Sequence, residues 1–418
     1  MMDWSCYSDF LKCLGVDAMP QPYGRNFDEV MREYTARGVW FLQDDFLISL
    51  QEKYKLFPQK YEFVQASLRA VREHELLARH SLLLYHMLSD RKEGSVVNVE
   101  HLPIPPTKDL APVYEMSAFF SQLAFAPEMI AYLSDRAVPA DVIHDTMLDC
   151  FEGAILNFEM LFGRNGFEAD RIFRWNQRYL NHTLLRIGAL CFEMRSHFVD
   201  LAVVLQNTTG ESMILVNSRP ISADGYLAGS AGQEKTDWIA DFTQSEEYFE
   251  GYRANPQTSR IIKERICLGR TEWHVEVSAE DPVISVHIPT GKGFTEESIE
   301  RSYTRCLEIL ARSFPEYRPK CFYCHSWLMD PQLKEMLKPT SNIVAFQSKY
   351  LRFAYDSMGV DVFTFLFHMP NVKQLADLPE DTSLQRRVKA HYLDGGYIYE
   401  PGGVFFFDAL QKTMKKGE

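Results

Sequence analysis

The stretch that decides the fold of the C-terminal half is VISVHIPTGKGFTEESIERSYTRCLEILARSFPEYRPKCFYCHSW, residues 283–327. It begins with alternating β-branched residues, passes through the glycine-containing loop TGKGF, and then carries apolar side chains at helical spacing from Ile299 to Phe314. The short apolar run CFYCHSW follows, and beyond it Asp330 and Pro331 are typical of a helix start. This order predicts a strand, a crossover helix and a second strand parallel to the first.

The second predicted strand contains C-x-x-C-H at residues 321–325, which matches the attachment signal of a c-type haem. Cys321 and Cys324 should point to opposite faces, because side-chain direction alternates along a strand. The two thiols then cannot hold one haem or one zinc ion together, and no second cysteine pair supplies further zinc ligands. We therefore interpret the match as a coincidence on a core strand and expect no metal.

The loop between the first strand and the helix suits an anion. Gly291 and Gly293 let the backbone approach a phosphate closely, Lys292 adds a positive charge, and the helix N-terminus points its amides outward. The loop contains neither GxxxxGK[ST] nor GxGxxG. Two alternatives therefore stay open, an ordinary strand-to-helix turn and a nucleotide-binding loop.

A second polar feature precedes this unit. WHVEVS and VISVHI flank the turn AEDP, and this pattern predicts a hairpin. With a four-residue loop, His274 lies opposite His287 and Glu276 opposite Ser285, which gathers polar side chains on one face. An imidazole and a carboxylate there could relay a proton from an amine. The alternative is that this face meets solvent or the other domain.

The remainder of the chain divides into two parts. The first 170 or so residues contain successive helical patterns, such as VPADVIHDTMLDCFEGAILNFEMLFG, and β-rich runs such as FVDLAVVLQ and SMILVNS follow. Near the C-terminus, VDVFTFLF predicts a strand, DTSLQRRVKAHYLDGG a helix, and YIYEPGGVFFF a closing hairpin. We predict an α+β protein with a helical domain, residues 1–170, and a mixed-sheet αβ domain, residues 171–418.

The composition of the chain argues against nucleic-acid binding and against a membrane-spanning protein. Among 418 residues, 44 are Lys or Arg and 57 are Asp or Glu, which gives a net charge of −13. Non-specific binding to nucleic acid or to an anionic membrane is therefore not expected. The longest apolar runs are shorter than the roughly 18 residues that a membrane span requires. The N-terminal stretch MMDWSCYSDFLKCLG lacks the features of an export signal, so we expect a cytoplasmic protein.

Several runs resemble a known family when taken together and in order. They are DVIHDTMLDCF, LLRIGALCFEM, EWHVEVSAEDPVISVHIP, CHSWLMDPQLKEML, SNIVAFQSKYLRF and LPEDTSLQRRV. This set is similar to a bacterial family of acyltransferase-domain proteins that join a helical N-terminal domain to a GNAT-like (N-acetyltransferase-like) C-terminal domain. The resemblance covers nearly the whole chain, and it implies the same fold here.

The resemblance also implies where a donor would bind. In GNAT-like domains the fourth and fifth strands are parallel but splay apart, and the pantetheine arm of acetyl-CoA or another acyl-CoA lies between them. VISVHIP is similar to the fourth strand and CFYCHSW to the fifth. The implied cofactor-binding residues are His287, Ile288, Gly291, Lys292, Gly293, Phe294 and Ser326.

The implied reaction is attack by an amine of a small molecule or peptide on the thioester carbonyl. The predicted catalytic residues are Glu276 or His287 as the base and Tyr350 as a proton donor. The alternative is a binding or scaffolding protein that keeps the fold without the chemistry. Glu296 and Glu297, two carboxylates beside the expected phosphate, favour this alternative.

Overall fold

The computed structural model describes residues 6–90, 102–103, 110–289 and 293–414. The chain divides into two compact units, Met1–Ile187 and Gly188–Glu418. The predicted boundary between residues 170 and 171 precedes α10 (Arg171–Leu180), which belongs to the first unit.

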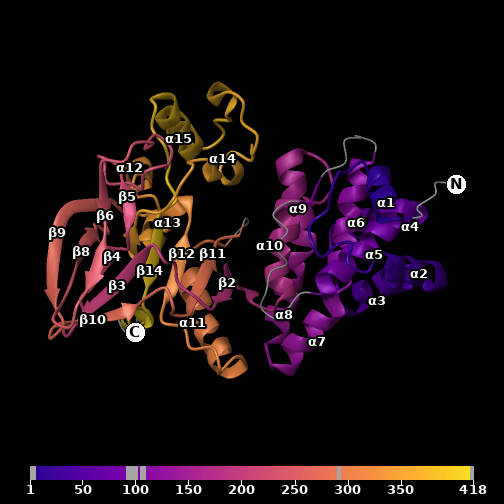
Figure 1. Ribbon diagram of the computed structural model, residues 1–418, viewed down its shortest axis with the longest axis horizontal. Coiled ribbons are helices and arrows are strands. Elements are labelled where there is room, and N and C mark those ends of the chain that lie inside the picture. The colour runs from indigo at the N-terminus through magenta and orange to yellow at the C-terminus, as the bar shows by residue number, and fades with distance from the viewer. Residues whose placement is uncertain (1–5, 91–101, 104–109, 290–292, 415–418) are drawn as a thin grey trace. The chain divides into compact units, whose positions relative to one another are not determined.

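The N-terminal unit is built of helices, as predicted (Figure 1). The extended backbone of His74 separates α4 from α5. Gly163 ends α9 in the left-handed conformation, at φ 68°. The elements are α1 (Tyr7–Leu14), α2 (Phe27–Arg37), η1 (Trp40–Leu42), α3 (Asp44–Tyr54), α4 (Tyr61–Glu73), α5 (Glu75–Ser89), α6 (Ala111–Leu123), α7 (Ala126–Asp135), α8 (Ala140–Cys150), α9 (Glu152–Phe162), α10 and β1 (Leu184–Ile187).

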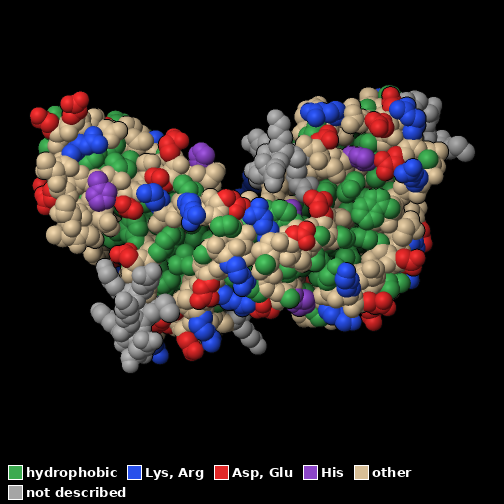
Figure 2. All heavy atoms as spheres, turned by 90° about the horizontal axis from the view of Figure 1, so that it is seen from below, with side chains coloured by type: hydrophobic (Ala, Val, Ile, Leu, Met, Phe, Trp, Pro, Cys, Tyr) green, Lys and Arg blue, Asp and Glu red, His purple; other side chains and the backbone are tan. Residues whose placement is uncertain are grey.

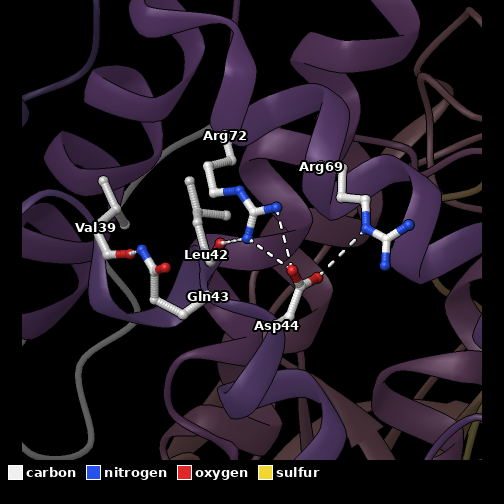
Figure 3. A network of polar contacts seen from close by, with 6 residues as sticks. All are labelled: Val39, Leu42, Gln43, Asp44, Arg69 and Arg72. Carbon is white, nitrogen blue, oxygen red and sulfur yellow. Dashed lines mark hydrogen bonds and ion pairs between the residues drawn. The ribbon is translucent and has the colours of Figure 1, made fainter.

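A polar network ties the start of α3 to α4 in this unit (Figure 3). The Asp44 carboxylate accepts two hydrogen bonds of 3.2 Å from Arg72 and one of 3.5 Å from Arg69. Arg72 also donates to the Leu42 carbonyl at 3.3 Å. A carboxylate in the first turn of a helix is favoured by the helix dipole, so Asp44 stabilises α3 while it orients α4.

The C-terminal unit contains two larger sheets and a two-stranded one. The first sheet runs β2-β11-β12-β14-β13 within this unit, and the second runs β10-β3-β4-β8-β7 with β9 paired to β8. The strands are β2 (Leu190–Arg195), β3 (Ala202–Asn207), β4 (Ser212–Val216), β5 (Arg219–Ile221), β6 (Trp238–Ala240), β7 (Phe242–Gln244), β8 (Tyr248–Ala254), β9 (Ile261–Gly269), β10 (Trp273–Val277), β11 (Val283–His287), β12 (Phe322–His325), β13 (Leu351–Phe353) and β14 (Gly402–Phe405). The helices are α11 (Glu296–Ser313), η2 (Trp327–Met329), α12 (Leu333–Met336), α13 (Asn342–Ser348), α14 (Asp361–Phe365), η3 (Leu375–Asp377), α15 (Ser383–Leu393) and α16 (Phe407–Met414).

The first sheet has different neighbours on its two faces. The helix α11 covers one face with Ile299, Tyr303 and Leu310, all buried. The opposite face packs against the second sheet, where Val283 and Tyr323 share a core cluster with side chains of β3 and β4. Figure 1 shows β3, β4, β8 and β9 beside the first sheet within this unit. The predicted strand, helix and parallel strand are confirmed as β11, α11 and β12.

The predicted hairpin of β10 with β11 is wrong. Strand β10 pairs with β3, so that His274 lies opposite Gln206, and β11 pairs with β2 and β12. Both strands alternate polar and apolar residues, and alternation shows which side chains share a face without showing which strand lies alongside. Trp273 packs in the core of the second sheet, which draws β10 away from β11.

Two further expectations near the C-terminus need correction. The predicted strand VDVFTFLF contains the short helix α14, in which Val362 and the cap residue Leu366, four residues apart and joined by a main-chain hydrogen bond of 2.9 Å, both pack into the cluster beneath α15. The predicted closing hairpin is absent, since β14 lies between β12 and β13 instead of pairing with the residues just before it. The predicted helix at DTSLQRRVKAHYLDGG is confirmed as α15, which Thr382 caps.

Candidate functional site

The candidate site lies where β11 and β12 part. The two parallel strands are in register at two positions, Ile284 with Phe322 and Ser285 with Tyr323. Beyond Ser285, β11 continues to pair with β2, and beyond Tyr323, β12 continues to pair with β14. Each strand thus follows its outer neighbour after the common segment, which separates them from one another.

The main chain of β11 faces this separation. The Ile284 amide donates to the Cys321 carbonyl of the neighbouring chain segment at 3.0 Å. Since N–H groups alternate sides along a strand, the amides of Val286 and Ile288 point toward β12 as well. Ile288 lies past the last registered pair, so its amide faces the side on which the two strands have parted.

A pocket lies at the start of α11. Thr295 caps the helix by accepting a 3.2 Å hydrogen bond from the Ser298 amide, and Gly293 before it adopts φ 108°, which favours glycine. Ser302 accepts a hydrogen bond of 2.9 Å from the Ala189 amide, and this contact brings the turn before β2 onto the helix. The pocket has a volume of about 460 Å³ and is lined by Gly188, Ala189, Gly293, Ser298, Arg301, Ser302 and Arg305.

This pocket is suited to an anion, because it combines a helix N-terminus with two arginines. Gly291 and Lys292, which the sequence placed in the same loop, lie outside the described residues. The two acidic residues at the helix start are both exposed, and Glu297 forms an ion pair of 3.5 Å with Arg301. Both partners of this pair are more than two-thirds exposed, so solvent screens it strongly.

An imidazole and a carboxylate meet on the face of β11 opposite α11. The Nε2 atom of His287 lies 2.8 Å from a carboxylate oxygen of Glu193 on β2. The two side chains share a face because Glu193 is in register with Ser285, two residues before His287. They are 26% and 16% exposed, so both remain accessible to a substrate.

Further polar side chains surround this pair. His325, at the end of β12, contacts the Tyr355 ring at 4.2 Å between centroids. Desolvation lowers the pKa of His325, a hydrogen bond to the Glu400 backbone opposes this, and the charges of Arg195 and His287 lower the pKa further. Arg195 and His287 therefore lie close enough to the end of β12 for their charges to act on His325.

The predicted proton donor, Tyr350, lies on the α11 side of the sheet. Its hydroxyl forms a hydrogen bond with the Tyr303 hydroxyl, and both rings are buried. Burial raises the pKa of each hydroxyl well above its usual value. In the same region Phe294, which follows the glycine loop, contacts Phe346 at 5.4 Å between ring centroids.

The other predicted residues lie in separate places. Glu276 is on β10 in the second sheet, where its carboxylate lies 3.3 Å from His274. The structure therefore does not bring Glu276 and His287 together as the predicted hairpin would. Ser326 follows β12, and its hydroxyl accepts a hydrogen bond of 3.2 Å from the Leu328 amide as a cap. The proposed roles of these residues stay predictions.

Sequence reasoning missed Glu193. The run LCFEMR is recognisable as a strand, but its partner is some ninety residues away in the chain. A correct assignment of β2 as the antiparallel neighbour of β11 would have found it, because the register then places Glu193 beside His287.

Within residues 6–90, 102–103, 110–289 and 293–414, no group of three or more His, Cys, Asp or Glu side chains is arranged to hold a metal ion. No helix in the described part of the chain has the length and apolar character needed to span a bilayer. Figure 2 shows acidic and basic side chains interspersed on the face that it draws.

A mixed sheet with a parallel strand pair that parts beside a helix N-terminus defines the GNAT-like class of fold. The sequence profile described as "GNAT-like C-terminal domain" matches residues 184–405, more than half of the chain. The protein belongs to this family. A comparison with curated proteins finds no match.

Solved structures of acyltransferases share the fold over both units. A point mutant of an acyltransferase in complex with octanoyl-CoA has a TM-score of 0.61 at 17% identity, over 95% of this chain and 98% of that one. An acyltransferase in complex with decanoyl-CoA and teicoplanin has a TM-score of 0.60 at 17% identity, with the same coverage. One in complex with CoA and 10C-teicoplanin has a TM-score of 0.58 at 18% identity, again with 95% and 98% covered.

Proposed function

We propose that this protein transfers an acyl group from acyl-CoA to an amine. The observation that carries the proposal is the parting of β11 and β12, with a pocket at the start of α11 and the pair of His287 and Glu193 on the other face. The similar solved acyltransferases hold octanoyl-CoA or decanoyl-CoA, which supports acyl-CoA as the donor.

The donor would be held by the chain as follows. The phosphates occupy the pocket lined by Gly293, Arg301 and Arg305, where helix amides and guanidinium groups favour negative charge. The predicted Gly291 and Lys292 would complete this loop. The pantetheine arm lies along β11 past Ser285, where main-chain groups that no longer pair with β12 are available to it.

The acceptor amine attacks the thioester carbonyl, a C–N bond forms, and the C–S bond breaks to release the CoA thiolate. His287 takes the proton that the amine loses, and Glu193 stabilises the resulting imidazolium. Donation from Nε2 to Glu193 leaves the lone pair of the neutral ring on Nδ1. A β11 amide stabilises the oxyanion, and Tyr350 is the proposed source of a proton for the thiolate.

The proposed acceptor is a small-molecule or peptide amine. Two of the similar structures contain teicoplanin or 10C-teicoplanin, which supports an acceptor of small-molecule size.

The test is thermal unfolding of the whole chain with acetyl-CoA, octanoyl-CoA, decanoyl-CoA or ATP. An acyl-CoA at a hundred times its Kd should stabilise the protein by about 2.7 kcal/mol. Gly293→Glu should abolish this effect, because it adds a negative charge beside the phosphates. Gly210→Glu is the matched control, since both glycines have positive φ and open space where a Cβ would lie.

Loss of the acyl-CoA effect in Gly293→Glu, with the effect kept in Gly210→Glu, would support the proposal. A wild-type protein that responds to no acyl-CoA would favour the scaffolding alternative instead. Stabilisation by ATP alone would favour a nucleotide-binding domain.

A further inference from the structure

Arg195, the last residue of β2, lies on the same face of the sheet as the proposed base. It is in register with Val283, as Glu193 is with Ser285, so the side chains of Arg195 and Glu193 point the same way. The guanidinium carbon lies 5.9 Å from the centre of the Tyr323 ring. Tyr323 is the last residue of β12 that is in register with β11, so Arg195 lies beside the point where the strands part.

The charge of Arg195 has no counter-ion among the described residues. Its side chain is partly buried and contacts the Tyr323 ring, and its carbonyl accepts a hydrogen bond from the Tyr317 hydroxyl. The nearest carboxylate along the strand, Glu193, is bonded to His287 instead. A guanidinium carries five N–H donors, and a partly buried one is normally matched by an anion.

Two other arginines of this unit are paired with carboxylates. Arg219 forms an ion pair of 2.7 Å with Asp200, and Arg265 forms one of 2.6 Å with Asp241. Arg219 is on β5 of the two-stranded sheet, and Arg265 is on β9, which pairs with β8 of the second sheet. Arg195 differs from these two in having no carboxylate partner among the described residues, and its guanidinium lies beside the last registered pair of β11 and β12.

We propose that Arg195 binds a carboxylate of the substrate, so that one of the two reactants is a carboxylic acid. The inference rests on the proposed acyl transfer and names a substrate class for it. A guanidinium fork matches the planar geometry of a carboxylate and can form two parallel hydrogen bonds with it. A single negative charge is favoured over a doubly charged phosphate, because the Glu193 carboxylate lies on the same face.

The carboxylate can be carried by either reactant. On the acceptor, it would belong to an amino acid or a similar amine, and its binding would hold the amine on the same face as His287. On the donor, it would be the far end of an acyl group such as succinyl. Both sources use the same recognition chemistry, so the experiment has one arm for each.

The acceptor arm compares glycine with glycinamide, and β-alanine with its amide, using acetyl-CoA. The donor arm compares succinyl-CoA with butyryl-CoA, using one neutral amine. In one of the two arms, wild-type kcat/KM should be higher for the compound that carries the carboxylate than for its neutral counterpart. Arg195→Met should lower kcat/KM for that carboxylate by roughly tenfold to a hundredfold and leave its neutral counterpart unchanged, which is the range expected for charge-assisted hydrogen bonds.

Two further variants separate recognition from folding. Arg195→Lys keeps the charge without the planar fork and should restore part of the preference. Arg318→Met is the matched control, because Arg318 is exposed on the connection between α11 and β12 and should leave the ratio unchanged. A structural role for Arg195 would lower kcat/KM for the acid and the neutral compound alike, and that result would overturn the inference. Equal wild-type kcat/KM within every pair would also overturn it.

Direct binding distinguishes this inference from the proposed function. Calorimetric titration of the wild type and Arg195→Met with glycine, glycinamide, succinyl-CoA and butyryl-CoA requires no turnover. If a carboxylate compound binds in a manner that depends on Arg195 but the protein transfers no acyl group, the carboxylate subsite stands and the proposed acyl transfer is wrong. If the protein transfers acyl groups without any preference for a carboxylate, the proposed function stands and the subsite is wrong.

Discussion

The two faces of the sheet at the parting of β11 and β12 differ in chemistry, although the same strands form both. On the α11 face, the hydroxyls of Tyr303 and Tyr350 bond to one another and their rings are at most 4% exposed. On the opposite face, Glu193 and His287 are 16% and 26% exposed and carry titratable groups. Alternation of side chains along a strand thus separates the buried tyrosines from an imidazole and a carboxylate that are partly open to solvent.

This difference between the two faces predicts which substitutions should change stability and which should change activity. Buried tyrosines whose hydroxyls bond to one another contribute to stability, because a buried polar group without a hydrogen-bond partner lowers the free energy of unfolding. The imidazole and the carboxylate keep part of their surface in solvent, and an amide in place of either one can still form a hydrogen bond, so such changes should cost little stability. We therefore expect substitutions on the α11 face to act mainly on stability and those on the opposite face mainly on activity, apart from Tyr350, the proposed proton donor.

The largest expected effect is that of His287→Gln on activity. Glutamine keeps a donor for Glu193 but cannot accept the proton of the amine, so kcat/KM should fall roughly 10²-fold to 10⁴-fold. The free energy of unfolding should change by less than about 1 kcal/mol. Steady-state kinetics and urea unfolding measure the two effects.

His274→Gln is the matched control, because His274 also lies beside a glutamate, on β10. Its kcat/KM should equal that of the wild type. A loss of activity in His274→Gln as large as that in His287→Gln would return the role of base to Glu276, the other residue that the sequence predicted for it.

Glu193→Gln should have a smaller effect on the same face. The amide can still accept a hydrogen bond from His287 but no longer stabilises a positive imidazolium, so kcat should fall on the order of 10-fold to 100-fold. Glu276→Gln serves for comparison and should leave kcat unchanged. If kcat is instead insensitive to Glu193→Gln, the pair of Glu193 and His287 is structural.

On the α11 face, Tyr350→Phe tests whether this tyrosine donates a proton or only packs. Each single change, Tyr350→Phe or Tyr303→Phe, leaves one buried hydroxyl without its partner and should cost about 1–3 kcal/mol of unfolding free energy. The double variant removes both hydroxyls and should recover most of that loss.

Kinetics of the same three variants decide the role of Tyr350. A fall in kcat in Tyr350→Phe and in the double variant, but not in Tyr303→Phe, would indicate proton donation. Equal kcat in all three would assign Tyr350 to packing alone.

The smallest expected effect concerns pH and Glu400, whose backbone accepts the hydrogen bond from His325. Burial, with the nearby charge of Asp361, raises the pKa of Glu400 to about 7 from its usual 4.5. The folded state therefore binds the proton more tightly, and this contribution to stability is complete below pH 4.5 and is lost as the pH rises through 7.

Glu400→Gln lacks this titration. Between pH 4.5 and 8, the wild type should lose on the order of 1–2 kcal/mol of unfolding free energy relative to the variant. Urea unfolding at several pH values measures the difference. A difference that stays constant over this range would show that the Glu400 carboxyl is not perturbed in the folded protein.

The sequence by itself determined the local elements and the order in which they follow. The helical first part, the strand, helix and parallel strand around TGKGF, and the helix after Thr382 all follow from patterns within short windows. The capping chemistry of Thr295 and Thr382 could be predicted for the same reason, since a cap involves residues only three positions apart. His287 was placed correctly at the end of the strand that leads into the glycine loop.

Tertiary structure alone decided which strands lie side by side. Side-chain alternation is the same for every possible neighbour, so it could not show that β10 joins β3 or that β2 joins β11. For this reason the carboxylate beside His287 is Glu193 and not the predicted Glu276. Only the fold showed that Arg195 lies beside Tyr323 of β12. The partners of these residues come from strands far apart in the chain, and burial of each strand's apolar face selects the pairing.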